Sequence, residues 1–153
     1  MPRYWVLTMT EANAAIALRE RTIGFGERSR SLCAKLTEGD LATFYLTRAS
    51  SEEKAAPVQA FMGLVRVVGP MFESNDLLWP PRESEIFPWR RKIEVVLSKG
   101  RLPIRPLIGK LELITNDVYW ALPLSNAARE LSKHDFDLVR AGLEAAGAAK
   151  EPV

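Results

Sequence analysis

The sequence predicts an α+β fold, in which five to six mostly antiparallel strands form a small twisted barrel with flanking helices. Aromatic and β-branched segments bounded by turn residues recur along the chain, and segments with helical spacing of apolar residues lie near both of its ends. The expected strands follow one another mostly through hairpins. They do not alternate regularly with helices, so the pattern is that of an α+β domain.

The size and composition of the chain fit one globular domain. It has 153 residues, of which 47% are hydrophobic and 26% are charged, and one core suffices for that length. We expect this domain to span residues 1–147, followed by a frayed tail over 148–153. No apolar run approaches the length of a membrane span, and the start lacks the order of a signal peptide. We therefore expect a cytoplasmic protein with no membrane partner.

The first third of the chain alternates strand and helix patterns. Residues 3–9 (RYWVLTM) have the composition of a buried strand, and Thr10 is a good N-cap for a helix over 11–22. The two glycines of residues 23–26 (IGFG) predict a tight turn. A short helix over 27–36, a turn at 38–40 and a strand over 41–48 are expected next.

The rest of the chain predicts further strands and a closing helix. Residues 57–68 are expected to form a hairpin with the strand over 41–48, and the four prolines of 69–88 indicate an irregular excursion. A strand over 89–97, a proline-punctuated turn over 101–111 and a last strand over 118–124 are expected to follow. Ser132 and Asp135 have the spacing of a capping box for a helix that reaches Gly147.

Residues that commonly carry catalysis or bind metals are scarce. Cys33 is the one cysteine, which excludes paired-cysteine zinc sites, and we expect it to pack in the core. His134 is the one histidine, and its place at the start of the last helix favours a surface or capping role. The chain also lacks the common phosphate, dinucleotide and zinc-protease motifs. We therefore expect no cofactor, no metal and no enzymatic activity.

Aromatic and cationic residues lie together in residues 87–92 (FPWRRK), and strands elsewhere supply further aromatic rings. Ring faces beside Arg and Lys suit a nucleic acid, since stacking contributes ~1–3 kcal/mol per base and the cations pair with phosphates. The alternative is that the rings fill the core. The net charge is only +2, so a nucleic-acid contact requires a local patch.

Several short motifs occur in an order that resembles a known family. They are Tyr4-Trp5, residues 36–40 (LTEGD) before Phe44-Tyr45, 60–67 (AFMGLVRV), 88–91 (PWRR), 104–107 (IRPL), 111–114, Tyr119-Trp120 and Glu130-Leu131. Over residues 3 to 145 this order resembles the EVE domain family of the PUA-like superfamily, which is related to the YTH domains that read methylated adenine in RNA.

The resemblance implies a PUA-like barrel with a pocket at one mouth that holds a single modified base of RNA or DNA. The implied base-binding residues are Trp5, Thr8, Met9, Thr10, Ile23, Gly24, Phe25, Phe87 and Trp89, with Trp5, Phe25, Phe87 and Trp89 stacking on the base. The implied phosphate partners are Arg30, Arg90 and Arg91. A protein of this kind is expected to be a monomer or a weak dimer.

Ile23 departs from the family, which usually has a tryptophan there, so the pocket needs another aromatic wall. Two alternatives remain open. The related ASCH domains include hydrolases of acylated nucleosides, for which Thr8 or Thr10 beside Glu11 are the available groups. The other alternative is a protein-interaction scaffold with a decayed pocket, in which Trp79 contacts a partner or packs against the barrel.

Overall fold

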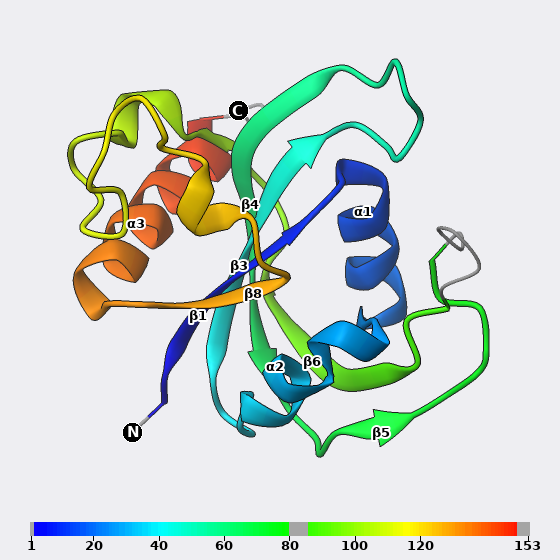
Figure 1. Cartoon of the computed structure of the whole chain (residues 1–153). Helices are drawn as coiled ribbons and strands as arrows, with labels where there is room; N and C mark the ends of the chain where they lie inside the picture. The colour runs from blue at the N-terminus through cyan, green and yellow to red at the C-terminus, as the bar shows by residue number, and fades with distance from the viewer. Residues whose placement is uncertain (1, 80–85, 150–153) are drawn as a thin grey trace.

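The computed structural model describes residues 2–79 and 86–149 of the chain. One curled mixed sheet forms a half-barrel, with helices α1 and α3 on opposite sides of it (Figure 1). The main strands follow the order β2-β6-β4-β3-β1-β8 across the sheet, and two short strands, β5 and β7, pair with β6 and β4. The α+β fold with a small twisted barrel is therefore confirmed.

The elements have the following bounds. The strands are β1 (Tyr4–Met9), β2 (Thr22–Phe25), β3 (Leu41–Arg48), β4 (Pro57–Val67), β5 (Phe72–Glu73), β6 (Trp89–Leu97), β7 (Leu102–Pro103) and β8 (Ala128–Leu131). The helices are α1 (Glu11–Glu20), α2 (Arg30–Lys35) and α3 (Lys133–Ala149), with short 3₁₀ turns η1 (Glu27–Ser29), η2 (Arg105–Leu107) and η3 (Leu122–Leu124).

Strand β1, which lies between β3 and the edge strand β8, explains the path of the chain. It pairs in parallel with β3 on one side and antiparallel with β8 on the other. Parallel neighbours need a crossover, and residues 10–40 provide it with α1, β2 and α2. The predicted N-cap of α1 is confirmed, because the Thr10 hydroxyl accepts a hydrogen bond from the backbone N–H of Asn13 at 3.2 Å.

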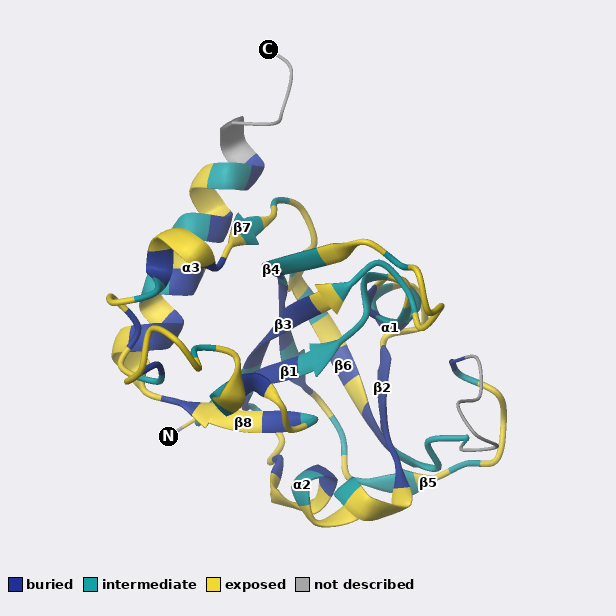
Figure 2. Cartoon of the chain, turned by 45° about the horizontal axis from the view of Figure 1, so that its top comes forward, coloured by how far each residue is buried: buried dark blue, intermediate teal, exposed yellow. Residues whose placement is uncertain are grey.

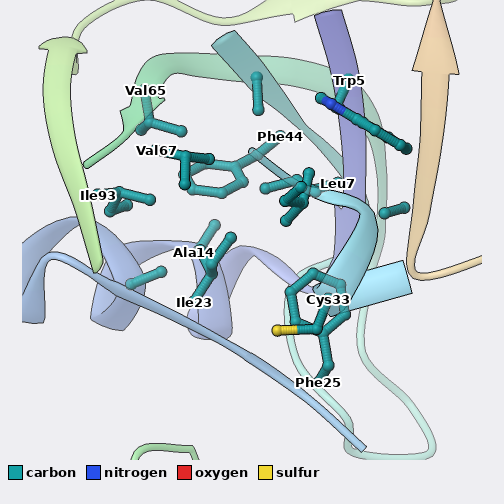
Figure 3. Close-up of a cluster of buried hydrophobic side chains, with 14 of the residues drawn as sticks. Trp5, Leu7, Ala14, Ile23, Phe25, Cys33, Phe44, Val65, Val67 and Ile93 are labelled. Atoms are coloured by element: carbon teal, nitrogen blue, oxygen red, sulfur yellow. The ribbon is translucent and has the colours of Figure 1, made fainter. Parts of the chain in front are cut away.

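Two hydrophobic clusters cover the two faces of the sheet. Leu7 and Phe44 belong to the cluster under α1, α2 and β2 (Figure 3), whereas Val6 and Tyr45 belong to the cluster under α3. Figure 2 shows the buried residues of β1 and β3 in dark blue. Successive strand residues point to opposite faces. The central strands are therefore buried on both sides, and Cys33 packs in the first cluster as expected.

Two expectations about secondary structure are wrong, and one strand was not expected. Residues 22–25 form the buried strand β2 along β6, where the tight turn over 23–26 was expected. Residues 118–124, expected as a strand, form turns and η3, and the last strand is β8. β8 has only four residues, of which the middle two are charged, so the sequence shows no alternation of apolar and polar residues there.

The other expected elements are present. β3 and β4 form the predicted hairpin, and the Ser132 hydroxyl accepts from the backbone N–H of Asp135 at 3.2 Å at the start of α3. The described part of the excursion over 69–88 contains only β5, and residues 80–85 lie outside the described residues. α3 extends into the expected tail, of which 150–153 also lie outside them. None of the helices in the described part combines the length and apolarity that a membrane span requires.

Candidate functional site

A cavity of about 450 Å³ opens where the end of β1, the start of α1, β2 and the segment before β6 meet. Most of the sequence-predicted base-binding residues line it, namely Thr8, Met9, Thr10, Ile23, Gly24, Phe25 and Phe87. Its volume falls within the range of pockets that bury small ligands. The predicted arrangement of β1, the segment after α1 and Phe87 around one hollow is therefore present.

Two aromatic side chains form one wall of the cavity. The rings of Trp79 and Phe87 meet edge to face, with centroids 5.2 Å apart and an interplanar angle of 73°. Trp79 is 4% exposed, and its buried Nε1 has no hydrogen-bond partner among the described residues. Unpaired buried donors are costly in a folded protein, so this N–H is a candidate partner for a ligand acceptor.

Gly24 allows this wall to approach β2. A Cβ atom at Gly24 would lie 3.2 Å from both Leu78 Cδ2 and Phe87 Cβ, and 3.3 Å from the Phe87 carbonyl oxygen. Phe87 itself has a φ of 53°, which is uncommon for a bulky residue. The glycine is needed here for close packing of β2 against the irregular segments at Leu78 and Phe87, and not for the turn that the sequence indicated.

The rest of the cavity lining is polar and cationic. Arg28 is exposed and Arg48 is half-buried, and neither has an ion-pair partner among the described residues. No carboxylate, histidine, cysteine or lysine of the described residues lines the cavity. The Thr8 hydroxyl is buried and unpartnered, while that of Thr10 is engaged in the N-cap. The electrostatics of the opening favour an anionic or acceptor-rich ligand.

The prediction that Trp5 lines this cavity is wrong. Trp5 is 3% exposed and belongs to the buried cluster (Figure 3). Its Nε1 donates to Asp40 Oδ2 at 2.9 Å, and the Asp40 carboxylate also accepts the backbone N–H groups of Arg3 and Thr37. The indole therefore fastens β1 to the turn before β3.

Trp89 and Arg30 pack on each other outside the cavity lining. The Arg30 guanidinium lies 4.0 Å from the centroid of the Trp89 ring, and Trp89 Nε1 donates to Glu27 Oε2 at 2.7 Å. Cation–π packing of this kind covers a ring face. The structure thus gives Trp89 and Arg30 other partners than those that the sequence predicted.

Arg90 and Arg91 are buried, so their prediction as phosphate partners is also wrong. Each is 5% exposed. The Arg91 guanidinium donates to the carbonyl oxygens of Leu36 and Gly69 at 2.6 and 2.7 Å, and that of Arg90 donates to Phe87 O at 3.2 Å and to Asp76 O. Burial lowers the pKa of Arg90. Both cations satisfy carbonyl groups of irregular segments that flank β6.

Groups with possible catalytic or metal-binding chemistry lie elsewhere. The Glu11 carboxylate forms an ion pair with Arg101 and does not line the cavity. Among the described residues, Glu112, His134 and Asp135 are close enough to share an ion. However, Asp135 accepts the backbone N–H groups of Glu112 and Leu113 at 2.7 and 2.8 Å. These two hydrogen bonds fasten a loop to α3. The Asp135 carboxylate also raises the pKa of exposed His134 through a hydrogen bond.

A model of the EVE domain matches residues 3–141. The chain belongs to the EVE domain family. A UPF0310 protein of Mycolicibacterium gilvum is 26% identical over 143 residues, which cover 91% of this chain and 94% of that protein. Another UPF0310 protein, from Mycobacterium avium, is 23% identical over 139 residues, covering 91% of this chain and 96% of that protein.

Solved structures share the fold of this EVE domain. The Mmi1 YTH domain superposes with a TM-score of 0.64 at 12% identity, covering 97% of this chain and 79% of that chain. The YTH domain of a Zygosaccharomyces rouxii protein, solved in complex with N6-methyladenosine RNA, gives 0.61 at 11% identity, covering 92% and 86%. The EVE domain therefore has the PUA-like fold that YTH domains use.

Sequence reasoning missed Trp79 and Arg48 as lining residues, and it assigned no role to Arg28 within the lining segment 23–30. Trp79 was interpreted as packing against the barrel or contacting a protein partner, and it does pack, but at the cavity wall. A tryptophan between prolines in a long excursion was the available signal. Arg28 and Arg48 had no distinguishing pattern, because exposed arginines at strand and helix ends are common.

Proposed function

We propose that this EVE domain binds nucleic acid by holding one modified base in the cavity between β1, β2 and the Trp79–Phe87 wall. The observation that carries the proposal is the combination, around one hollow of about 450 Å³, of an aromatic wall with a buried donor and two arginines that have no partner among residues 2–79 and 86–149. YTH domains of the same fold have been solved with N6-methyladenosine RNA and with m6A, which supports a base as the ligand.

Each part of the cavity has a role in this proposal. The Trp79 and Phe87 rings replace the aromatic wall that Ile23 does not supply, and Ile23 and Phe25 add apolar surface for a methyl group. The Trp79 Nε1–H donates to an acceptor of the base. Arg28 and Arg48 pair with the flanking phosphates, since a nucleotide extruded from a strand keeps its backbone at the rim.

Two observations favour binding over the alternatives. Hydrolysis of an acylated nucleoside needs a general base in reach of the scissile bond, and the described lining offers none, with Glu11 paired to Arg101. A decayed pocket would be filled by side chains, whereas this one is open. The proposal is therefore a binding module without a catalytic step.

The test is fluorescence anisotropy with short RNA and DNA strands that carry one adenine, N6-methyladenine, cytosine, 5-methylcytosine or 5-hydroxymethylcytosine. We expect one modified base to bind more tightly than its unmodified parent, with an affinity that falls as salt rises. Equal and salt-insensitive affinities for all strands would contradict the proposal.

Two variants and a control locate the binding site. Trp79→Phe keeps a ring and removes the donor, so we expect it to reduce the preference for the modified base. Arg48→Gln is expected to weaken the binding of all RNA and DNA strands alike. It should also lower the slope of log affinity against log salt concentration by about one. Arg140→Gln is the matched control, because Arg140 is exposed on α3 and pairs with Glu144. Equal effects of Arg48→Gln and Arg140→Gln would place the contact elsewhere.

A further inference from the structure

A second hollow, of about 230 Å³, lies beside η3, which contributes two residues to its lining. Tyr119, Leu122, Pro123 and Arg129 line it together with Thr115 and Asn116. The base pocket and this hollow are lined by neighbouring parts of one segment, since Leu122 and Pro123 line the hollow and residues 125–127 line the pocket. The Thr8 N–H donates to Ala127 O at 3.1 Å, which fixes this segment to the end of β1.

The hollow is bordered by an unusual concentration of exposed apolar side chains. Val118, Tyr119 and Leu122 are 78%, 67% and 71% exposed, and all three lie within five residues of one another. Other exposed large apolar side chains, such as Leu77 and Val96, are scattered over the chain. Grouped exposure of this kind marks a contact surface, whereas single exposed residues do not.

The segment that carries these side chains has a fixed shape. The Asn116 side-chain oxygen accepts the backbone N–H groups of Val118 and Tyr119 at 2.9 and 3.2 Å. The N–H of Leu122 then donates to the carbonyl of Tyr119 at 3.1 Å. Because local hydrogen bonds hold the backbone, the Tyr119 ring is presented to solvent from a preorganised platform.

The charge at the hollow selects among possible partners. Arg129 is exposed on β8 and has no ion-pair partner in the described part of the chain. Strand alternation directs its neighbour Glu130 to the opposite face, and no carboxylate of the described residues lines the hollow. An aromatic ring beside an unpaired arginine is the pairing that single-stranded nucleic acid uses, stacking on the ring and placing a phosphate on the cation.

We propose that Tyr119, Leu122 and Arg129 form a second nucleotide subsite that stacks a base flanking the one held in the pocket. This inference rests on the proposed function. The nucleic-acid strand crosses the segment formed by η3 and residues 125–127. Arg129 then pairs with a phosphate beyond this segment. The domain then reads at least two neighbouring nucleotides of a single strand, of which only one enters the pocket.

The experiment compares free nucleosides with strands. Wild type, Tyr119→Ser and Arg129→Gln are titrated by calorimetry with N6-methyladenosine and 5-methyl-2′-deoxycytidine, and by anisotropy with short RNA and DNA strands that carry these bases centrally. Strands in which either the 5′ or the 3′ flank is replaced by abasic residues show which neighbour is stacked. Val96→Ser is the control for removal of an exposed apolar side chain, and analytical ultracentrifugation of wild type and Tyr119→Ser reports self-association.

We expect Tyr119→Ser to weaken strand binding about fivefold or more and to leave nucleoside binding unchanged, with the loss reproduced by removing one flank only. Unchanged strand affinity in Tyr119→Ser and Arg129→Gln, with wild-type nucleoside binding, would overturn the second subsite and leave the base pocket standing. A dimer that Tyr119→Ser dissociates would also overturn it, in favour of contact between two copies. Failure of wild type to bind nucleosides and strands would instead reject the proposed function, and the subsite with it.

Discussion

Gly24→Ala tests whether close packing of β2 against the segment before β6 builds the pocket wall. The added Cβ would lie 3.2 Å from Leu78 Cδ2 and Phe87 Cβ, whereas carbon atoms prefer about 3.5–4.0 Å. The neighbours must retreat by a few tenths of an ångström, and overpacking of this kind costs about 1–3 kcal/mol. Replacing glycine with alanine also lowers the conformational entropy of the unfolded chain, which offsets this cost by about 0.4–1 kcal/mol. The net expectation is a free energy of unfolding lower by about 1–2 kcal/mol.

The assay is urea unfolding followed by circular dichroism, together with a thermal melt in which we expect a drop of about 2–8 °C. Gly69→Ala is the matched control, because its added Cβ would meet only Lys92 Cβ, at 3.8 Å. We expect that variant to stay within about 0.5 kcal/mol of wild type. If Gly24→Ala unfolds at the same urea concentration as Gly69→Ala, the close approach of Phe87 to β2 does not depend on the glycine.

Three further predictions concern buried groups. Trp5→Phe removes the hydrogen bond to the Asp40 carboxylate and should cost about 1.5–3 kcal/mol of stability without changing ligand affinity; a specific loss of affinity in the folded variant would return Trp5 to the binding site. Arg91→Gln leaves buried carbonyl groups unpaired, so urea unfolding should show a loss of about 3 kcal/mol or more, and wild-type stability would refute the structural role. Burial raises the pKa of the Cys33 thiol to about 11, so the folded state retains a proton that the unfolded chain loses above about pH 9. Stability should therefore fall by up to about 3 kcal/mol as pH rises toward 11, and a Cys33→Ala variant with the same alkaline slope as wild type would contradict this.

The sequence predicted the long elements well because their composition or periodicity is distinctive. β3 and β4 are largely apolar and β-branched runs of eight and eleven residues, and α3 repeats its apolar positions over seventeen. β2 was mistaken for a turn because its glycine serves tight packing against Phe87, and glycine alone does not distinguish a turn from a close approach. β8 was missed because four residues are too few for a period to be visible.

The candidate site was predicted in outline, with errors that share one cause. Ring and cation types indicated nucleic-acid contact, but only the fold decides which of them face the cavity. Arg90 and Arg91 are both buried at the start of β6 and bind carbonyl groups, while Arg28 and Arg48 line the cavity from a 3₁₀ turn and a strand end. Trp5 and Trp79 differ in the same way, since Trp5 has a carboxylate partner and the Nε1 of Trp79 has none among the described residues.

The position of β1 between β3 and β8 has a consequence for synthesis of the protein on the ribosome. β1 is made first, yet its parallel partner follows about thirty residues later and its antiparallel partner lies near the other end of the chain. Such long-range pairing carries a large loop-closure cost before any contact forms. The nascent chain thus emerges with β1 unpaired on one edge until β8 has been synthesised, and chaperones that shield apolar segments have their longest opportunity at residues 4–9.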